Sequence, residues 1–64
     1  MKTMMVYARD IQPGDLLRTT DGDWVKTGGI QPLGEDGTKV GILSPEGLIS
    51  APADGLVVVR RGEV

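Results

Sequence analysis

Few residue types in this chain could carry catalytic chemistry. The sequence of 64 residues contains no His and no Cys, so the most common general base and the most common thiol nucleophile are both missing. Two carboxylate pairs remain, Asp21 with Asp23 and Glu35 with Asp36, and both stand next to a glycine where a turn is expected. Acidic residues in turns usually cap free backbone amides and stay in water. We therefore expect no catalytic residue and no enzymatic activity.

Metal and cofactor sites have equally little support. Without thiolate or imidazole ligands, the soft metal sites are missing. The run Asp21-Gly22-Asp23 lacks the alternating oxygen ligands and the distal carboxylate of a calcium loop. Gly28-Gly29 differs from a phosphate-binding loop because no helix is expected after it and the Lys and Ser/Thr of that motif are missing. The sequence predicts no metal, no cofactor and a flexible corner at Gly28-Gly29.

Trp24 is the residue whose exposure matters most for function. The chain has one Trp, one Tyr and no Phe, so the indole is its largest apolar side chain. Burying it in a core or at the rim of a barrel is therefore the favoured interpretation. The alternative is an exposed Trp24 beside Arg18 and Lys26 on neighbouring hairpin arms, where it stacks a nucleic-acid base or clamps a peptide. Arg18, Trp24 and Lys26 are therefore the candidate nucleic-acid site. Seven basic against nine acidic residues add no attraction through net charge.

Turn residues separate short apolar and β-branched runs along the chain. The ten Gly and four Pro fall at intervals between these runs, and no window shows a helical apolar period. The six strands that we expect cover residues 4–8, 16–20, 24–27, 38–43, 48–51 and 56–60. Residues 28–37 are either a loop or a strand continuation broken by Pro32, with Ile30 and Leu33 against the core. The tail, 61–64, is expected to fray.

Four turns are predicted from local residue preferences. Pro13-Gly14 fits a type II turn, with Asp10 and Asp15 as side-chain caps of its free amides. The Asp21-Gly22 pair predicts a tight hairpin with a type I′ turn. Residues 44–47 fit a type I turn closed by a left-handed glycine, and residues 52–55 fit a 3₁₀ or β-turn.

This pattern predicts one all-β domain over residues 1–64, a small SH3-like barrel of five or six short antiparallel strands. An oligonucleotide-binding-type barrel is the competitor, but it normally needs a longer chain and a helix that residues 28–37 would supply poorly. The expected core consists of Val6, Leu17, Val25, Val40, Ile42, Val57 and Val59. A core this small and free of disulfides favours reinforcement by an oligomer or a partner.

The closing strand, 56–60, is apolar on both of its faces. Val57 and Val59 suffice for the core, which leaves Leu56 and Val58 outside, and Met5 and Tyr7 form a similar surplus on the first strand. These four residues are the candidate protein interface, for a partner or for a second copy in a two-fold dimer. The alternative is that the segment 28–37 folds over this surface within the monomer.

A resemblance to known families is carried by the run Ala8-Arg9-Asp10-Ile11-Gln12-Pro13-Gly14-Asp15-Leu16-Leu17. It is similar to the opening motif of hedgehog/intein-type β domains, where D-hydrophobic-x-x-G-D-hydrophobic leads into a strand. Splicing chemistry does not carry over, because the chain begins Met1-Lys2 and has no His or Cys. Together with Asp21-Gly22-Asp23-Trp24 and the closing run 52–60, the motif also resembles short uncharacterised proteins of actinobacteria and their bacteriophages. This second resemblance spans nearly the whole chain and implies no activity.

These observations favour a non-enzymatic interaction module, a phage or actinobacterial accessory protein that binds a host protein or itself. A single-stranded nucleic-acid-binding barrel and a minor structural subunit of a virion are the alternatives. No run approaches the roughly 18 apolar residues of a membrane span, and the apolar start is too short for a signal peptide. We therefore expect no membrane partner and a cytoplasmic location, in the host cytoplasm if the chain is phage-encoded.

Overall fold

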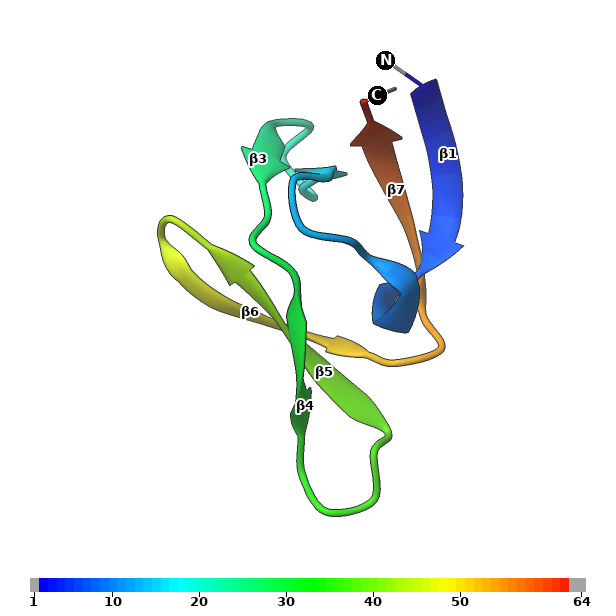
Figure 1. Cartoon of the computed structure of the whole chain (residues 1–64), viewed down its shortest axis with the longest axis vertical. Helices are drawn as coiled ribbons and strands as arrows, with labels where there is room; N and C mark the ends of the chain where they lie inside the picture. The colour runs from blue at the N-terminus through cyan, green and yellow to red at the C-terminus, as the bar shows by residue number, and fades with distance from the viewer. Residues whose placement is uncertain (1, 63–64) are drawn as a thin grey trace.

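The strands of this chain are grouped into two antiparallel sheets (Figure 1). The computed structural model describes residues 2–62. A four-stranded sheet has the order β1-β7-β2-β3, and a three-stranded sheet has the order β4-β5-β6. The elements are β1 (Lys2–Tyr7), the 3₁₀ turn η1 (Ala8–Asp10), β2 (Leu16–Arg18), β3 (Trp24–Lys26), β4 (Ile30–Leu33), β5 (Lys39–Ser44), β6 (Gly47–Pro52) and β7 (Leu56–Arg61).

The all-β prediction is confirmed, but the described strands do not close into the expected SH3-like barrel. Residues 2–62 form seven strands instead of five or six, and β1 and β3 are left as edges of the larger sheet. The chain leaves that sheet at Gly28 and Gly29, where Gly29 has φ +103°. The Gly28 amide donates to the Leu43 carbonyl at 2.8 Å, and the Leu43 amide donates to the Gly29 carbonyl at 3.0 Å. The predicted corner at Gly28-Gly29 is therefore where the chain passes from one sheet to the other.

The segment expected to be a loop or a broken strand, 28–37, contains the regular strand β4. Pro32 lies inside it, opposite Val40 of β5. Proline has no amide hydrogen, so it is tolerated where a strand pairs on one side only, and β4 is an edge strand. Ile30 packs against the core as expected, and Leu33 is half-buried.

The core lies between the two sheets and is centred on four buried side chains: Ile11, Leu17, Ile42 and Val59. Val40 is also buried, so four of the expected core positions are confirmed. Val6 and Val57 pack against the core but are only half-buried, and so is Val25. Ile11, only 4% exposed, was missed because it follows the η1 turn and belongs to no strand.

The Pro13-Gly14 turn is formed as predicted. The Asp15 amide donates to the Gln12 carbonyl at 3.0 Å, and Gly14 has φ +93° at the third position of the turn. A type II turn requires a positive φ there. Asp15 also caps the turn, since its carboxylate accepts from the Gln12 amide at 3.0 Å. The capping role expected for Asp10 is wrong: in the described structure Asp10 contributes its backbone carbonyl to Arg61.

The hairpin between β2 and β3 is present, but its turn is not type I′. The Thr19 amide donates to the Asp23 carbonyl at 2.8 Å, and the Gly22 amide donates to the Thr19 carbonyl at 3.0 Å. Gly22 has φ +88°, whereas no non-glycine residue between 2 and 62 has a positive φ. A type I′ turn needs a positive φ at Asp21 as well. The loop is instead the three-residue kind that ends in a left-handed glycine.

The two later turns agree with their predictions. Pro45 and Glu46 connect β5 to β6, and Gly47 closes this turn with φ +124°. The Gly55 amide donates to the Pro52 carbonyl at 3.0 Å, which forms a β-turn before β7. At the other end of β7, the expected fraying is wrong for Arg61, which belongs to the strand; residues 63–64 of the predicted tail lie outside the described range.

Candidate functional site

Both groups of candidate binding residues lie on one face of the four-stranded sheet. Residues directly opposite each other in an antiparallel ladder point to the same face. Met5 pairs with Val58 and Tyr7 with Leu56. Arg18 pairs with Trp24. Leu16 pairs with Lys26 on one side and with Arg60 on the other, which connects the two groups. We call this surface the outer face: Thr3, Met5, Tyr7, Leu16, Arg18, Trp24, Lys26, Leu56, Val58 and Arg60.

The β1–β7 half of the outer face is apolar and uncovered. Met5 is 63% exposed, Leu56 is 62% exposed and Tyr7 is 42% exposed, while Val58 between them is half-buried. We call these four residues the apolar stripe. The alternative that residues 28–37 fold over it is wrong, because Ile30 of that segment packs against the core instead. The alternation of side chains along β1 and β7 was sufficient to predict the stripe, because its residues alternate along each strand with residues that point into the core.

Trp24 lies on the edge strand β3, directly opposite Arg18. It is half-buried, and the guanidinium carbon of Arg60 lies 4.2 Å from the centre of its ring. Arg9 stands over Tyr7 in the same way, at 4.5 Å. Such cation–π contacts hold an arginine against an aromatic face. Trp24 is thus outside the buried core, and Arg60 covers one face of its ring. Arg60 was missed as a site residue, although its parity with Leu56 and Val58 places it on the outer face.

The β2–β3 half of the outer face is positively charged. Arg18, Lys26 and Arg60 are exposed there, and we call them the basic cluster. Five of the seven basic residues lie on the strands of this sheet, and none of the acidic residues between positions 2 and 62 does. Within residues 2–62 the one ion pair joins Arg61 to Asp15, on the other side of the sheet, so the basic cluster has no acidic partner. Its charges are therefore available to a ligand.

Asp15 is a buried carboxylate with a structural role. Its side chain is 3% exposed and accepts from Arg61 through both oxygens, at 2.9 Å from Nε and at 2.8 Å from Nη2. The Arg61 bonds and the Gln12 amide lower the pKa of the Asp15 carboxyl, although burial acts in the opposite direction. The same contact raises the pKa of Arg61. This pair ties the end of β7 to the turn before β2.

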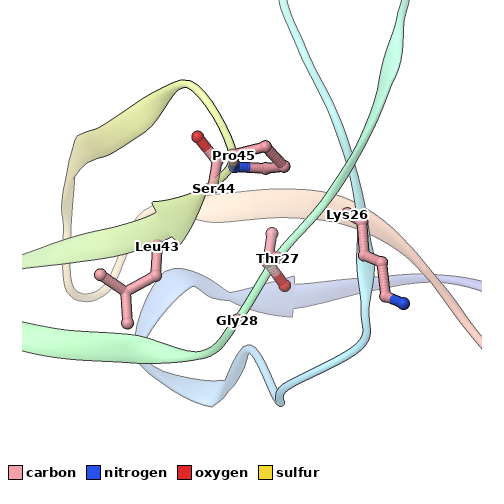
Figure 2. Close-up of a pocket in the computed structure, with 6 residues that line it drawn as sticks. All are labelled: Lys26, Thr27, Gly28, Leu43, Ser44 and Pro45. Atoms are coloured by element: carbon pink, nitrogen blue, oxygen red, sulfur yellow. The ribbon is translucent and has the colours of Figure 1, made fainter.

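A small apolar pocket lies where the two sheets meet (Figure 2). Its volume is about 280 Å³, and its walls are Lys26, Thr27, Gly28, Leu43, Ser44 and Pro45. The Thr27 hydroxyl already donates a hydrogen bond to the Asp15 carbonyl at 2.9 Å, so this donor is not free for a ligand in the pocket. In Figure 2 the Lys26 ammonium extends away from Leu43. The pocket offers room for one apolar side chain but no group that could do chemistry.

Of the two acidic pairs, Asp36 has the capping role that its turn position indicated. Its Oδ1 accepts from the Thr38 amide at 3.2 Å and from the Thr38 hydroxyl at 2.9 Å, and these bonds lower the pKa of the Asp36 carboxyl. Asp21 and Asp23 are exposed at the β2–β3 hairpin. No group of three or more potential metal ligands is found among the described residues.

Comparison of the chain with protein-family models, curated proteins and solved structures finds no match. The geometry of the outer face is therefore the basis on which function is inferred. Within residues 2–62, no helix has the length and apolar character needed to cross a bilayer.

Proposed function

We propose that this protein is a non-enzymatic interaction module and that the outer face of its four-stranded sheet binds a protein partner. The observation that carries the proposal is the apolar stripe. Met5 and Leu56 are each more than 60% exposed, and the β1–β7 register places them in adjacent cross-strand pairs with Val58 and Tyr7. Contiguous exposed apolar surface of this kind marks interaction sites in soluble proteins.

The composition of the outer face supports binding over catalysis. The chain has no His or Cys, and the carboxylate with the most hydrogen bonds, Asp15, is occupied by Arg61 on the core side of the sheet. The outer face combines aliphatic and aromatic side chains with arginines, which are typical constituents of the centres of protein interfaces. Because the chain resembles short proteins of actinobacteria and their phages, we assign it an accessory role in the cytoplasm of such a host.

A second copy of the chain is included in this proposal as a partner at the edge of the sheet. β1 is an edge strand of six residues, and its outer side pairs with no strand between residues 2 and 62. Pairing of β1 with β1 of a second copy gives a two-fold dimer with one continuous sheet. Arg18 and Lys26 of the basic cluster lie on β2 and β3, on the far side of the sheet from β1, whereas Arg60 lies on β7 next to β1.

A capture experiment with paired variants tests the proposal. The immobilised protein, the variant Met5→Ser/Leu56→Ser and the variant Leu43→Ser/Leu48→Ser are incubated with an actinobacterial lysate. Leu43 and Leu48 are 40% and 45% exposed on the other sheet, so the second variant is matched in chemistry, and it also alters the pocket. We expect proteins retained by the parent to be lost only with Met5→Ser/Leu56→Ser. Equal capture by all three proteins, or loss only with Leu43→Ser/Leu48→Ser, contradicts the proposed surface.

Single-stranded nucleic acid is the second candidate ligand, because Arg18, Trp24 and Lys26 lie together on the outer face. Their register supports this alternative: Arg18 is directly opposite Trp24, and Lys26 is two residues farther along the same strand. Retention on single-stranded DNA or RNA that falls steeply with rising salt would favour it, because phosphate contacts release bound counterions. The position of Arg60 over the indole argues against base stacking on that ring.

A further inference from the structure

We propose that the basic cluster, Arg18, Lys26 and Arg60, is a docking site for the carboxylates of an acidic, extended segment of the partner protein. This inference rests on the proposed function, since it names the class of partner that the outer face binds. The charge of the face, the spacing of its cations, the occupied aromatic rings and the adjoining apolar stripe all favour such a segment.

The charge distribution of the chain is strongly uneven. The net charge is −2, yet the strands of the four-stranded sheet contain basic residues and no acidic ones. The one basic residue of this sheet that is neutralised within residues 2–62 is Arg61, by Asp15. Three uncompensated cations on adjacent strands repel one another, and an anionic ligand relieves that repulsion while it gains its own attraction. The face therefore selects an acidic partner.

Two of the three cations, Lys26 and Arg60, lie in one row across the strands, with a spacing that fits an extended chain. Lys26, Leu16 and Arg60 lie side by side on β3, β2 and β7. Because neighbouring strands are about 4.8 Å apart, the backbones of Lys26 and Arg60 are separated by roughly 10 Å. Alternate residues of an extended peptide are about 7 Å apart, and the long, flexible Lys and Arg side chains can span the gap between this spacing and the separation of the two backbones. Two carboxylates at positions i and i+2 of the segment can therefore reach both cations.

The stacked arginine is already positioned for a carboxylate. Arg60 rests over Trp24, with its guanidinium carbon 4.2 Å from the ring centre. Stacking uses the face of the guanidinium and leaves its N–H groups, which lie in its plane, for a planar anion. Less side-chain freedom is lost on binding when the group is held in this way.

A protein segment fits the outer face better than a nucleic acid or a second copy. Arg60 and Arg9 already occupy faces of Trp24 and Tyr7, so a base would have to displace them before it could stack. The surface next to the basic cluster is the apolar stripe, which matches apolar side chains. The outer face of a second copy would bring two basic clusters into one interface, where like charges disfavour contact.

Synthetic peptides test the inference directly. The probe is a fluorescein-labelled nonapeptide, SESESLSLS, whose glutamates and leucines fall on one side of an extended chain. The controls are SKSKSLSLS, SESESSSSS and a twelve-nucleotide oligothymidine. Binding is followed by anisotropy and by the fluorescence of Trp24, the single tryptophan of the chain. We expect SESESLSLS to bind most tightly and to weaken by about tenfold or more between 20 and 300 mM NaCl.

Charge variants locate the site. Arg18→Glu/Lys26→Glu is expected to weaken SESESLSLS binding by about tenfold or more, because two attractions become repulsions. Lys2→Glu/Lys39→Glu makes the same change in net charge at two exposed positions outside the outer face and is expected to stay within about twofold. Should the double glutamate variant fail to fold, Arg18→Gln/Lys26→Gln removes the same charges without introducing new ones.

The outcomes separate this inference from the proposed function. Equal loss in both charge-reversal pairs, preference for SKSKSLSLS, no peptide binding, or tighter binding of oligothymidine each overturns the acidic segment as the ligand. In any of these cases, loss of lysate capture with Met5→Ser/Leu56→Ser still supports a protein-binding outer face. If neither Met5→Ser/Leu56→Ser nor Arg18→Glu/Lys26→Glu changes the proteins captured from the lysate, both the proposed function and this inference are contradicted.

Discussion

Arg61, the last residue of β7, binds both carboxylate oxygens of Asp15, which lies 46 positions earlier in the sequence. Asp15 also accepts from the Gln12 amide at 3.0 Å, and its backbone carbonyl accepts from the Thr27 amide at 2.8 Å. One residue thus connects the turn before β2, the end of β3 and the end of β7.

Replacing Asp15 by Asn is expected to lower the free energy of unfolding by about 1–2 kcal/mol. The substitution keeps the size of the side chain but replaces one acceptor oxygen by an NH2 donor, so one bond with Arg61 is lost and the other no longer involves a carboxylate. Bonds to charged groups contribute more than neutral ones. We expect a value near the lower end of the range for hydrogen bonds to charged groups, because the Arg61 side chain is partly exposed to solvent. Urea unfolding at pH 7 measures the change. Asp21→Asn is the matched control at an exposed position, and equal midpoints for both variants contradict the structural role of Asp15.

Acid is expected to destabilise the parent through Asp15. The folded-state pKa of this carboxyl lies below its ordinary value of about 3.9, so its contribution to stability is present above that value. The contribution is lost as the pH falls through the lowered folded-state pKa. Asp36 has the same sign, so part of the pH dependence will persist without Asp15. The urea midpoint is measured at pH 7, 5, 4 and 3, and we expect it to fall less steeply with decreasing pH for Asp15→Asn than for the parent. Equal slopes for the two proteins would show that groups other than Asp15 cause the acid sensitivity.

Gly14→Val is expected to cost about 1 kcal/mol or more, which corresponds to a fall of several degrees in melting temperature for a domain of this size. Gly14 has φ +93°, and a Cβ there would meet no atom within 4 Å, so the cost arises from the backbone alone. Gly62→Val is the control, because Gly62 has open space around it and no positive φ. Thermal unfolding followed by circular dichroism gives both values. A melting temperature of Gly14→Val equal to that of the control would show that the turn tolerates a β-branched residue.

Met5→Lys is expected to convert a dimer into a monomer at tens of micromolar. The substitution places a charge on the edge strand β1 and in the same position of its copy, a device that blocks edge pairing in natural sheets. Leu48→Lys is the control, because Leu48 is 45% exposed on β6, an edge strand of the other sheet. Light scattering after gel filtration gives the mass of each protein. A parent that is already monomeric rules out self-association and leaves the outer face to a different protein.

Features that depend on a few neighbouring residues were predictable from the sequence. The Pro13-Gly14 turn, the hairpin near Gly22 and the turn before β7 follow from the backbone preferences of Pro and Gly. Alternation along β1 and β7 was enough to separate the apolar stripe from core residues such as Val59, because side chains of a strand point to opposite faces in turn. These preferences act over one or two residues and need no knowledge of the neighbouring strand.

Features that depend on which strands become neighbours were decided only by the tertiary structure. The Arg60–Trp24 contact arises because β7 pairs with β2, and β2 with β3, which brings together residues from opposite ends of the chain. The division into two sheets follows from the pairing of Gly28 and Gly29 with Leu43, and Pro32 is a strand residue because β4 is an edge. No local preference specifies such pairings, since their free energy comes from burial and hydrogen bonds between segments distant in sequence.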